Sequence, residues 1–174
     1  MKQQKPKLTL AMATYDDFYG VYATVQGIRA NNSQPDLDQI EILVLDNNPE
    51  GQHASGCRDL AKDVGIRYEK FQDSTGTSAT RQKLIELARG DFVLVMDCHV
   101  NFQPGFLHDL LRYINYDIDP KDLFTGPIVY DRYWTSLNWR DPAPTWTHWE
   151  YVWCNGMLGM WSTIWDKPGH PSMA

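Results

Sequence analysis

Short apolar runs alternate with amphipathic segments along the amino-terminal part of the chain, and this alternation restricts the fold more than any other feature. The run Ile40-Glu41-Ile42-Leu43-Val44-Leu45 is rich in β-branched residues and almost continuously apolar, as expected for a central parallel strand covered on both faces. Further strands are predicted at residues 7–13, 66–71 and 92–96, with helices at 18–30, 54–64 and 78–88. This alternation predicts an α/β fold with a mainly parallel sheet flanked by helices.

The regular alternation ends in the carboxy-terminal part of the sequence. A helix is expected at residues 106–114 and a strand at 123–130. All 7 tryptophans of the chain follow this point, and neither helical nor strand periodicity is evident there. The sequence therefore divides into an α/β region at residues 1–130 and a Trp-rich segment at 131–174.

Composition restricts the compartment and the partners of the protein. No apolar run approaches the twenty or so residues of a membrane span, and no secretory signal is evident, so a cytoplasmic location is expected. The 3 cysteines are widely spaced, which favours reduced thiols over a disulfide framework or a zinc ribbon. The formal charge of −6 disfavours nonspecific binding to nucleic acid, so an anionic ligand must be bound by a local cluster.

The strongest chemical signal is Asp97-Cys98-His99, which directly follows an apolar predicted strand. Residues i and i+2 of an extended chain point to the same side, so Asp97 and His99 could bind one cation while Cys98 points away. Carboxylate with imidazole favours Mn²⁺, whereas Mg²⁺ is possible but prefers oxygen ligands. In isolation the tripeptide is better explained as a strand-end carboxylate beside a surface histidine, and its position after the fourth predicted strand favours the metal site.

A second signal is the polar loop of residues 73–77, which leads into a helix bearing Ser78 and Arg81 near its start. Backbone N–H groups, hydroxyls and a guanidinium at the positive end of a helix attract a diphosphate. The alternative is an ordinary serine cap with a solvated arginine.

Polar residues also follow the first two predicted strands. Thr14, Tyr15 and Asp16 come after the first strand, and Asp46 ends the second. An exposed tyrosine ring offers a stacking surface for a base, and a carboxylate accepts hydrogen bonds from a base N–H or a ribose hydroxyl. The acids, Asp17 included, could instead cap the helices that follow.

Together, Thr14-Tyr15-Asp16, Val44 to Asn48, Gly76 to Arg81 and Met96 to His99 resemble GT-A glycosyltransferases of the family 2 type, over about residues 7 to 130. The resemblance implies a Rossmann-like nucleotide-diphospho-sugar transferase fold. It assigns the base to Tyr15 and Asp46, the diphosphate to Arg81 and the metal to Asp97. His99 replaces the second acid of the usual DxD, and the variant is similar to the DxH of polypeptide N-acetylgalactosaminyltransferases, with Asn101 to Leu107 extending the match.

By this resemblance, residues 1–130 are expected to be the donor-binding core and residues 131–174 a partial, truncated acceptor-side segment. The expected function is metal-dependent transfer of a sugar from a nucleotide-diphosphate donor to an acceptor that the sequence does not specify. Two alternatives remain: a noncatalytic donor-binding module, and a sugar nucleotidyltransferase, against which the first loop counts because it is neither Gly-rich nor basic. Glu150 and His148 are weak candidates for the catalytic base, with His170 a third.

Overall fold

The computed structural model describes residues 5–73, 76–116, 146–154 and 157–164. The chain divides into two compact units, Met1–Ile118 and Asp119–Ala174. The domain boundary expected at residue 130 and the strand expected at 123–130 lie outside the described residues.

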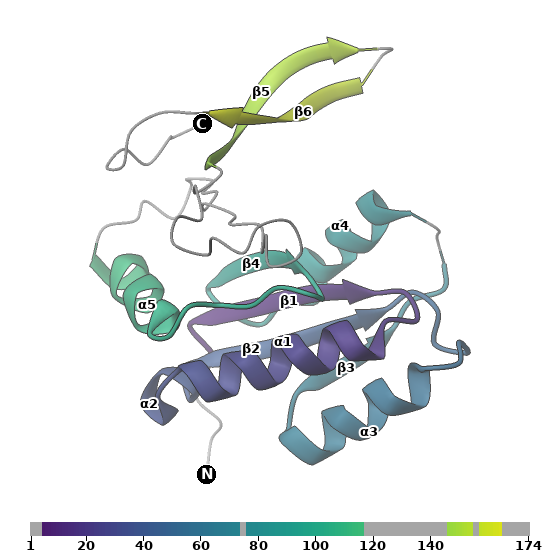
Figure 1. Cartoon of the computed structure of the whole chain (residues 1–174), viewed down its shortest axis with the longest axis vertical. Helices are drawn as coiled ribbons and strands as arrows, with labels where there is room; N and C mark the ends of the chain where they lie inside the picture. Colours follow the sequence, from purple (N-terminus) through teal and green to yellow (C-terminus); the bar gives the residue numbers. More distant parts are fainter. Residues whose placement is uncertain (1–4, 74–75, 117–145, 155–156, 165–174) are drawn as a thin grey trace, which may run out of the picture. The chain divides into compact units, whose positions relative to one another are not determined.

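The first unit is built on a four-stranded parallel sheet with the order β3-β2-β1-β4 (Figure 1). Its strands are β1 (Leu8–Thr14), β2 (Ile40–Asp46), β3 (Arg67–Lys70) and β4 (Phe92–Asp97). Each lies within two residues of its predicted position, and the predicted parallel α/β architecture is confirmed.

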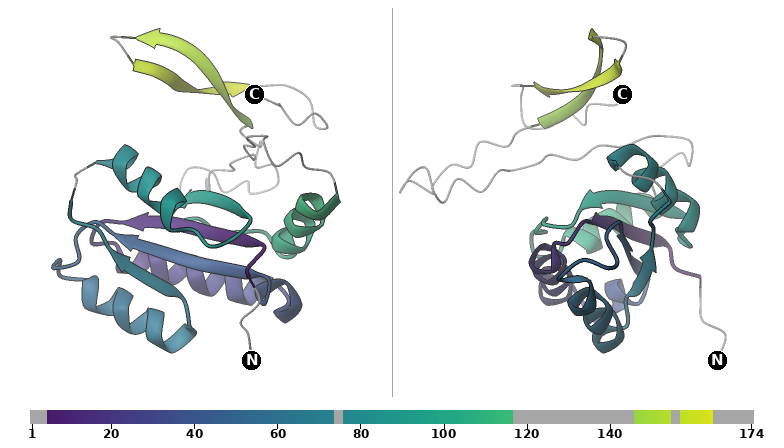
Figure 2. Two further views of the ribbon diagram at one scale, coloured as in Figure 1. Left: turned by 180° about the vertical axis from the view of Figure 1, so that it is seen from behind. Right: turned by 90° about the vertical axis from the view of Figure 1, so that its right-hand side faces the viewer.

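Helices cover both faces of this sheet, as Figure 2 shows. The helices are α1 (Phe18–Asn31), α3 (Ala54–Val64), α4 (Thr77–Leu87) and α5 (Phe106–Tyr116). Leu10 and Met12 of β1 pack in a core with α1, α3 and α5. Ala11, which points to the opposite side of the strand, packs with Leu84 of α4 in a second core. The predicted doubly covered sheet is therefore confirmed, and its continuous apolar strands are explained by burial on both faces.

Glycine geometry sets the ends of two helices. α3 ends at Gly65, whose φ of 72° is left-handed and whose N–H bonds to the Ala61 carbonyl. α4 begins after Gly76, which has a φ of 107°. A short helix that the sequence analysis did not predict, α2 (Gln34–Leu37), begins with a proline in its first turn.

The second unit contains an antiparallel pair, β5 (Trp146–Cys154) and β6 (Met157–Ile164), with an irregularity between Glu150 and Trp153. The sequence analysis assigned no element to this stretch, because its periodicity is poor. The signal that could have revealed it is the abundance of Trp, Tyr, Val and Thr around an Asn-Gly pair, because such residues favour strands and that dipeptide favours tight hairpins.

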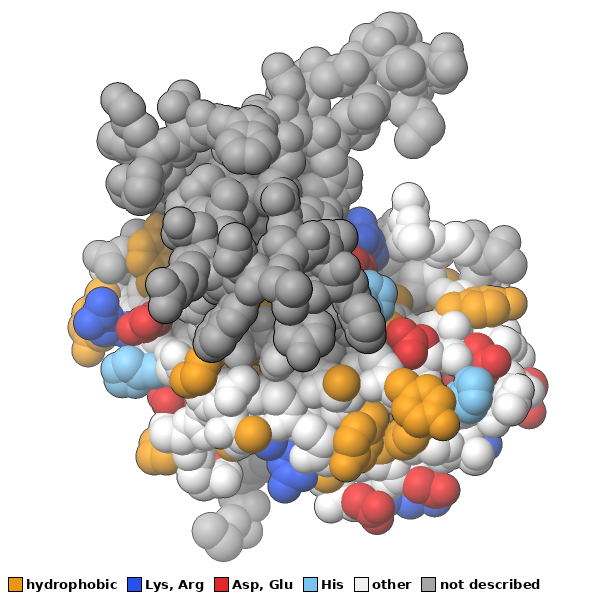
Figure 3. All heavy atoms as spheres, in the orientation of Figure 1, with side chains coloured by type: hydrophobic (Ala, Val, Ile, Leu, Met, Phe, Trp, Pro, Cys, Tyr) orange, Lys and Arg blue, Asp and Glu red, His pale blue; other side chains and the backbone are white. Residues whose placement is uncertain are grey.

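No helix in the described part of the chain has both the length and the hydrophobicity needed to cross a bilayer. On the face drawn in Figure 3, acidic, basic and histidine side chains of the first unit are interspersed. The described side chains visible on this face form no extended basic patch, in keeping with the net charge of −6.

Candidate functional site

The carboxyl ends of three neighbouring strands bring the predicted site residues to one edge of the sheet. Thr14 pairs in register with Asp46, and Ala13 pairs with Asp97. These positions are distant in sequence, and the parallel topology alone brings their backbones together. Ligands of open α/β sheets bind at this edge.

Asp46 is the most enclosed of these residues, with only 1% of its surface exposed. Its Oδ2 accepts a 2.5 Å hydrogen bond from the Tyr68 hydroxyl, and its Oδ1 accepts a 2.9 Å bond from the Asn48 N–H. Burial, followed by the bond to Asp46, raises the pKa of Tyr68, so this phenol remains a donor at neutral pH. The carboxylate caps no helix and instead holds the end of β2 to β3.

Asn47 connects three elements at the same edge, and the sequence analysis assigned it no role. Its backbone N–H bonds to the Thr14 carbonyl at 2.9 Å, and its Nδ2 donates to the Phe71 carbonyl at 3.3 Å. Its Oδ1 contacts the hydroxyl of Thr80 on α4. An amide directly after a buried strand was the available signal, because Asn can donate and accept at once.

The three residues after Thr14 have different roles. Asp16 adopts a left-handed φ of 57° and its Oδ1 accepts a 2.7 Å bond from the His53 N–H, so it ties the first loop to α3. Asp17 is the N-cap of α1, with Oδ1 accepting from the Gly20 N–H at 2.9 Å. Of the two acids, only Asp17 has the capping role that the sequence left open. Tyr15 is 71% exposed.

Arg81 of α4 lies beside Asp97, the last residue of β4, with Nη2 and Oδ1 3.4 Å apart. Both side chains are substantially exposed. Arg81 therefore lies on the same side of the sheet edge as Asp97. Ser78 is exposed in the first turn of α4 and is not its cap, because Gly76 occupies that position.

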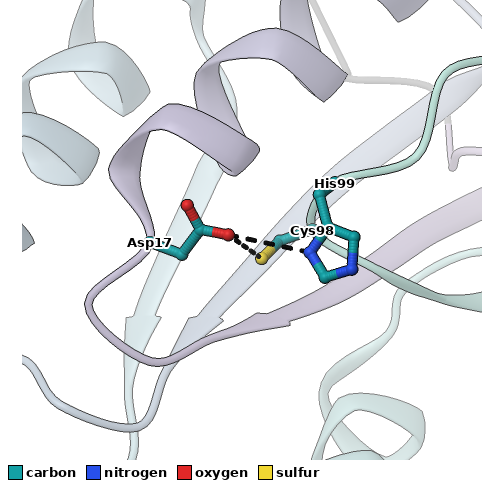
Figure 4. A group of neighbouring side chains, drawn as sticks. All are labelled: Asp17, Cys98 and His99. Carbon is teal, nitrogen blue, oxygen red and sulfur yellow. Dashed lines mark hydrogen bonds and ion pairs between the residues drawn. The ribbon is translucent and has the colours of Figure 1, made fainter. Parts of the chain in front are cut away.

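His99 lies close to Asp17, which the sequence analysis did not place with it (Figure 4). The donor atoms of Asp17, Cys98 and His99 lie within 4.8 Å of one another. Because β4 ends at Asp97, residues 98 and 99 follow a turn and not the strand alternation on which the sequence argument relied. The Cys98 thiol and the His99 imidazole both face Asp17, so the strand alternation expected to point Cys98 away from the metal ligands does not hold here.

Cys98 is buried, and its environment does not favour a reactive thiol. Burial, followed by the negative charge of Asp17 and the bond to it, raises the pKa of the Cys98 thiol to about 12. The thiol is thus protonated at neutral pH, in agreement with the expectation of an inert cysteine.

The weak catalytic candidates lie in the second unit. Glu150 and His148 are on β5, where their backbones pair with Met160 and Ser162 of β6. Their catalytic role stays a prediction. His170 lies outside the described residues.

The sequence matches Glycosyl transferase family 2 over residues 9–163. The chain belongs to this family. It is 25% identical over 117 residues to "Putative glycosyltransferase EpsH" of Bacillus subtilis, an alignment that covers 63% of this chain and 30% of the relative. It is 27% identical over 121 residues to "Uncharacterized glycosyltransferase MJ1057" of Methanocaldococcus jannaschii, covering 68% of this chain and 41% of the relative. The alignments thus span well under half of these family members.

Solved structures of GT-A glycosyltransferases share the fold of this family 2 chain. One is S. aureus TarS, with a TM-score of 0.54 and 16% identity over 71% of this chain and 41% of the other; TarS has also been solved with UDP-GlcNAc. Another is the mannosyltransferase PcManGT from Pyrobaculum calidifontis with GDP-Man and Mn²⁺, with a TM-score of 0.54 and 16% identity over 72% of this chain and 35% of the other. The GT-A fold expected from the sequence is confirmed.

Proposed function

We propose that this chain binds a nucleotide-diphospho-sugar donor and forms the donor half of a metal-dependent glycosyltransferase. The proximity of Arg81 to Asp97 carries the proposal, because it joins the start of α4 to the end of β4 at the ligand-binding edge of the sheet. A positively charged guanidinium and a carboxylate that binds a metal ion are the two groups that a diphosphate requires.

The nucleotide part of the donor would lie across the ends of β1 and β2. Exposed Tyr15 offers a ring face for the base, and it lies between Thr14 at the end of β1 and Asp16, which accepts a bond from the His53 N–H. Asp46 would reach a base N–H through the lone pairs that Tyr68 and Asn48 leave free.

The diphosphate would lie at the start of α4. The exposed hydroxyl of Ser78 and the guanidinium of Arg81 are both available there, together with the positive end of the helix dipole. This combination supports local phosphate binding in a protein whose net negative charge is otherwise unfavourable to anions.

Asp97 and His99 would hold the cation, with Mn²⁺ preferred over Mg²⁺. Their side chains are 60% and 68% exposed, and oxygen with neutral imidazole nitrogen suits manganese, so the residues fit the ion. When bound, the cation supplies Lewis-acid stabilisation of the charge that develops on the diphosphate.

Two solved structures that share this fold support the assignment. TarS has been solved with UDP-GlcNAc, and PcManGT with GDP-Man and Mn²⁺. UDP- and GDP-sugars are therefore the first donors to test. Glu150 and His148 are the proposed candidates for an acid–base role toward the acceptor.

Calorimetry on the full chain with UDP-GlcNAc and GDP-Man, in Mn²⁺, in Mg²⁺ and in chelator, tests the proposal. We expect at least about tenfold higher donor affinity in Mn²⁺ than in chelator, since the cation offsets most of the diphosphate charge. Equal affinity in both would reduce Asp97-Cys98-His99 to a structural turn and remove the metal from the proposal.

The variant His99→Asp sharpens this test. It should retain part of the cation-dependent affinity and shift the preference toward Mg²⁺, because it creates an all-oxygen site. Donor hydrolysis or sugar transfer measured alongside separates an enzyme from a binding module, which would bind the donor and leave it intact.

A further inference from the structure

Three side chains beside the proposed Mn²⁺ site bring one oxygen, one sulfur and one nitrogen atom together (Figure 4). The Cys98 Sγ lies 3.5 Å from Asp17 Oδ2, and the His99 Nδ1 lies 3.7 Å from the same oxygen. Asp97 is not a member of this group and instead pairs with Arg81.

The two separations from the Asp17 oxygen match those of a tetrahedral metal site. Zinc bonds of about 2.3 Å to sulfur, 2.0–2.1 Å to nitrogen and 2.0–2.2 Å to oxygen place tetrahedral ligand atoms about 3.6 Å (O to S) and 3.4 Å (O to N) apart. The observed separations differ from these values by a few tenths of an ångström at most. The Asp17 carboxylate therefore already lies at ligand spacing from both the sulfur and the imidazole nitrogen.

The surrounding structure holds two of the three ligands in place. The other oxygen of Asp17 is fixed by the Gly20 N–H at the start of α1. The turn that carries Cys98 is fixed by the hydroxyl of Thr24, which donates to the Cys98 carbonyl at 3.0 Å and accepts from the Val100 N–H at 2.9 Å. Such preorganisation lowers the conformational cost of binding an ion.

Access is from the histidine side. His99 is largely exposed and Asp17 is partly exposed, whereas Cys98 is buried. A cation would enter from solvent between the carboxylate and the imidazole, and meet the sulfur at the floor of the site. The fourth tetrahedral position would face the side of entry and remain available to water or to a ligand.

We propose that Asp17, Cys98 and His99 form a second metal site that binds a thiophilic divalent cation of the Zn²⁺ type. Thiolate with imidazole selects such cations over Mg²⁺ and Mn²⁺, which favour oxygen. On binding, the metal–sulfur bond replaces the S–H bond, and the thiol proton leaves to solvent.

The two sites share His99, and this consequence rests on the proposed function. A cation that holds the imidazole against Asp17 and Cys98 withdraws it from Asp97. Zn²⁺ should therefore antagonise Mn²⁺-dependent donor binding, and the thiol would make the donor site sensitive to soft metals.

Titration of the full, reduced chain with Co²⁺, a spectroscopic substitute for Zn²⁺, tests the thiol site without any nucleotide. We expect a sulfur-to-cobalt charge-transfer band that Zn²⁺ removes by displacement. The band should be lost in Cys98→Ser and retained in the matched double variant Cys57→Ser/Cys154→Ser, which removes the other 2 of the 3 cysteines. No band in the wild type, or an unchanged band in Cys98→Ser, would overturn the proposal.

The variant Asp17→Asn separates metal ligation from helix capping, because Asn is as good an N-cap as Asp. We expect Co²⁺ affinity to fall at least tenfold while the far-ultraviolet circular dichroism remains that of the wild type. Unchanged Co²⁺ affinity with intact structure would remove Asp17 from the site and contradict the three-ligand assignment.

The effect of Zn²⁺ on donor binding is the final test. Stoichiometric Zn²⁺ should lower Mn²⁺-dependent affinity for the donor in the wild type and leave it unaffected in Cys98→Ser. Failure of the donor to bind in Mn²⁺ alone counts against the proposed function, whereas the cobalt band decides the thiol site independently.

Discussion

Two aspartates end strands on either side of β1 at the same edge of the sheet, yet their surroundings are opposite. Asp46, at the end of β2, is 1% exposed and has both oxygens engaged by Tyr68 and Asn48. Asp97, at the end of β4, is 60% exposed at its side chain and faces Arg81 across 3.4 Å. The Asp46 carboxylate is enclosed by the protein, whereas the Asp97 carboxylate is open to solvent.

The position of each strand in the sheet explains the difference. β2 lies between β1 and β3, so the end of β2 is enclosed by neighbours on both sides. β4 is the edge strand of the sheet in the described part of the chain, so its end has a neighbour on one side. A carboxylate at an enclosed strand end must have its hydrogen bonds satisfied, whereas one at an edge can remain solvated.

The largest expected effect is on stability. Asp46→Ala should lower the free energy of unfolding by about 3 kcal/mol, because it leaves the Tyr68 hydroxyl and the Asn48 N–H without their acceptor. Urea denaturation monitored by far-ultraviolet circular dichroism measures this, because the tryptophans of the chain all lie outside the first unit. Asp97→Ala is the matched control and should change the free energy by no more than about 0.5 kcal/mol. Equal losses in the two variants would abolish the contrast between the aspartates.

Donor binding should show the reverse order. Asp97→Asn should reduce Mn²⁺-dependent donor affinity at least about tenfold, which corresponds to about 1.4 kcal/mol, because an amide is a poor ligand for the cation. Calorimetry measures the affinity, and Asp109→Asn, at an exposed acid on α5, is the control. A wild-type affinity in Asp97→Asn would show that the exposed carboxylate takes no part in donor binding.

The hydrogen bond that encloses Asp46 can be tested by itself. Tyr68→Phe should lower the unfolding free energy by about 1 kcal/mol, since it removes a donor to a carboxylate and little volume. In a double-mutant cycle with Asp46→Ala, the cost of Tyr68→Phe should largely disappear. Additive losses would indicate that the two side chains act independently.

The smallest effect is expected at the open end of the sheet. Arg81→Gln should change the unfolding free energy by less than about 0.5 kcal/mol, because exposed ion pairs contribute little to stability. Thermal and urea unfolding of this variant measure the change. A loss of unfolding free energy above about 1 kcal/mol would mean that the Arg81–Asp97 pair is structural. It would weaken the case that the two side chains are available to a ligand.

The elements of the first unit could be predicted because their signals are local. Apolar runs such as Phe92 to Met96 have strand length, and glycines mark the helix ends at Gly65 and Gly76. The pair β5 and β6 was missed because its residues lack a clear alternation, although their types favour strands. The predicted residues Thr14, Asp46 and Asp97 lie at one edge because the parallel order of the strands requires it.

Sequence by itself determined the strands, the helices and the residue types at each strand end, since hydrophobic periodicity and turn residues act over short distances. Only the tertiary structure decided which acid each polar group meets. Asn47 connects three elements separated in sequence, and Asp17 faces Cys98 and His99 from 81 and 82 positions away, the differences 98 − 17 and 99 − 17. Such contacts depend on strand order and on where β4 ends, because a shift from strand to turn at Asp97 redirects the two side chains that follow.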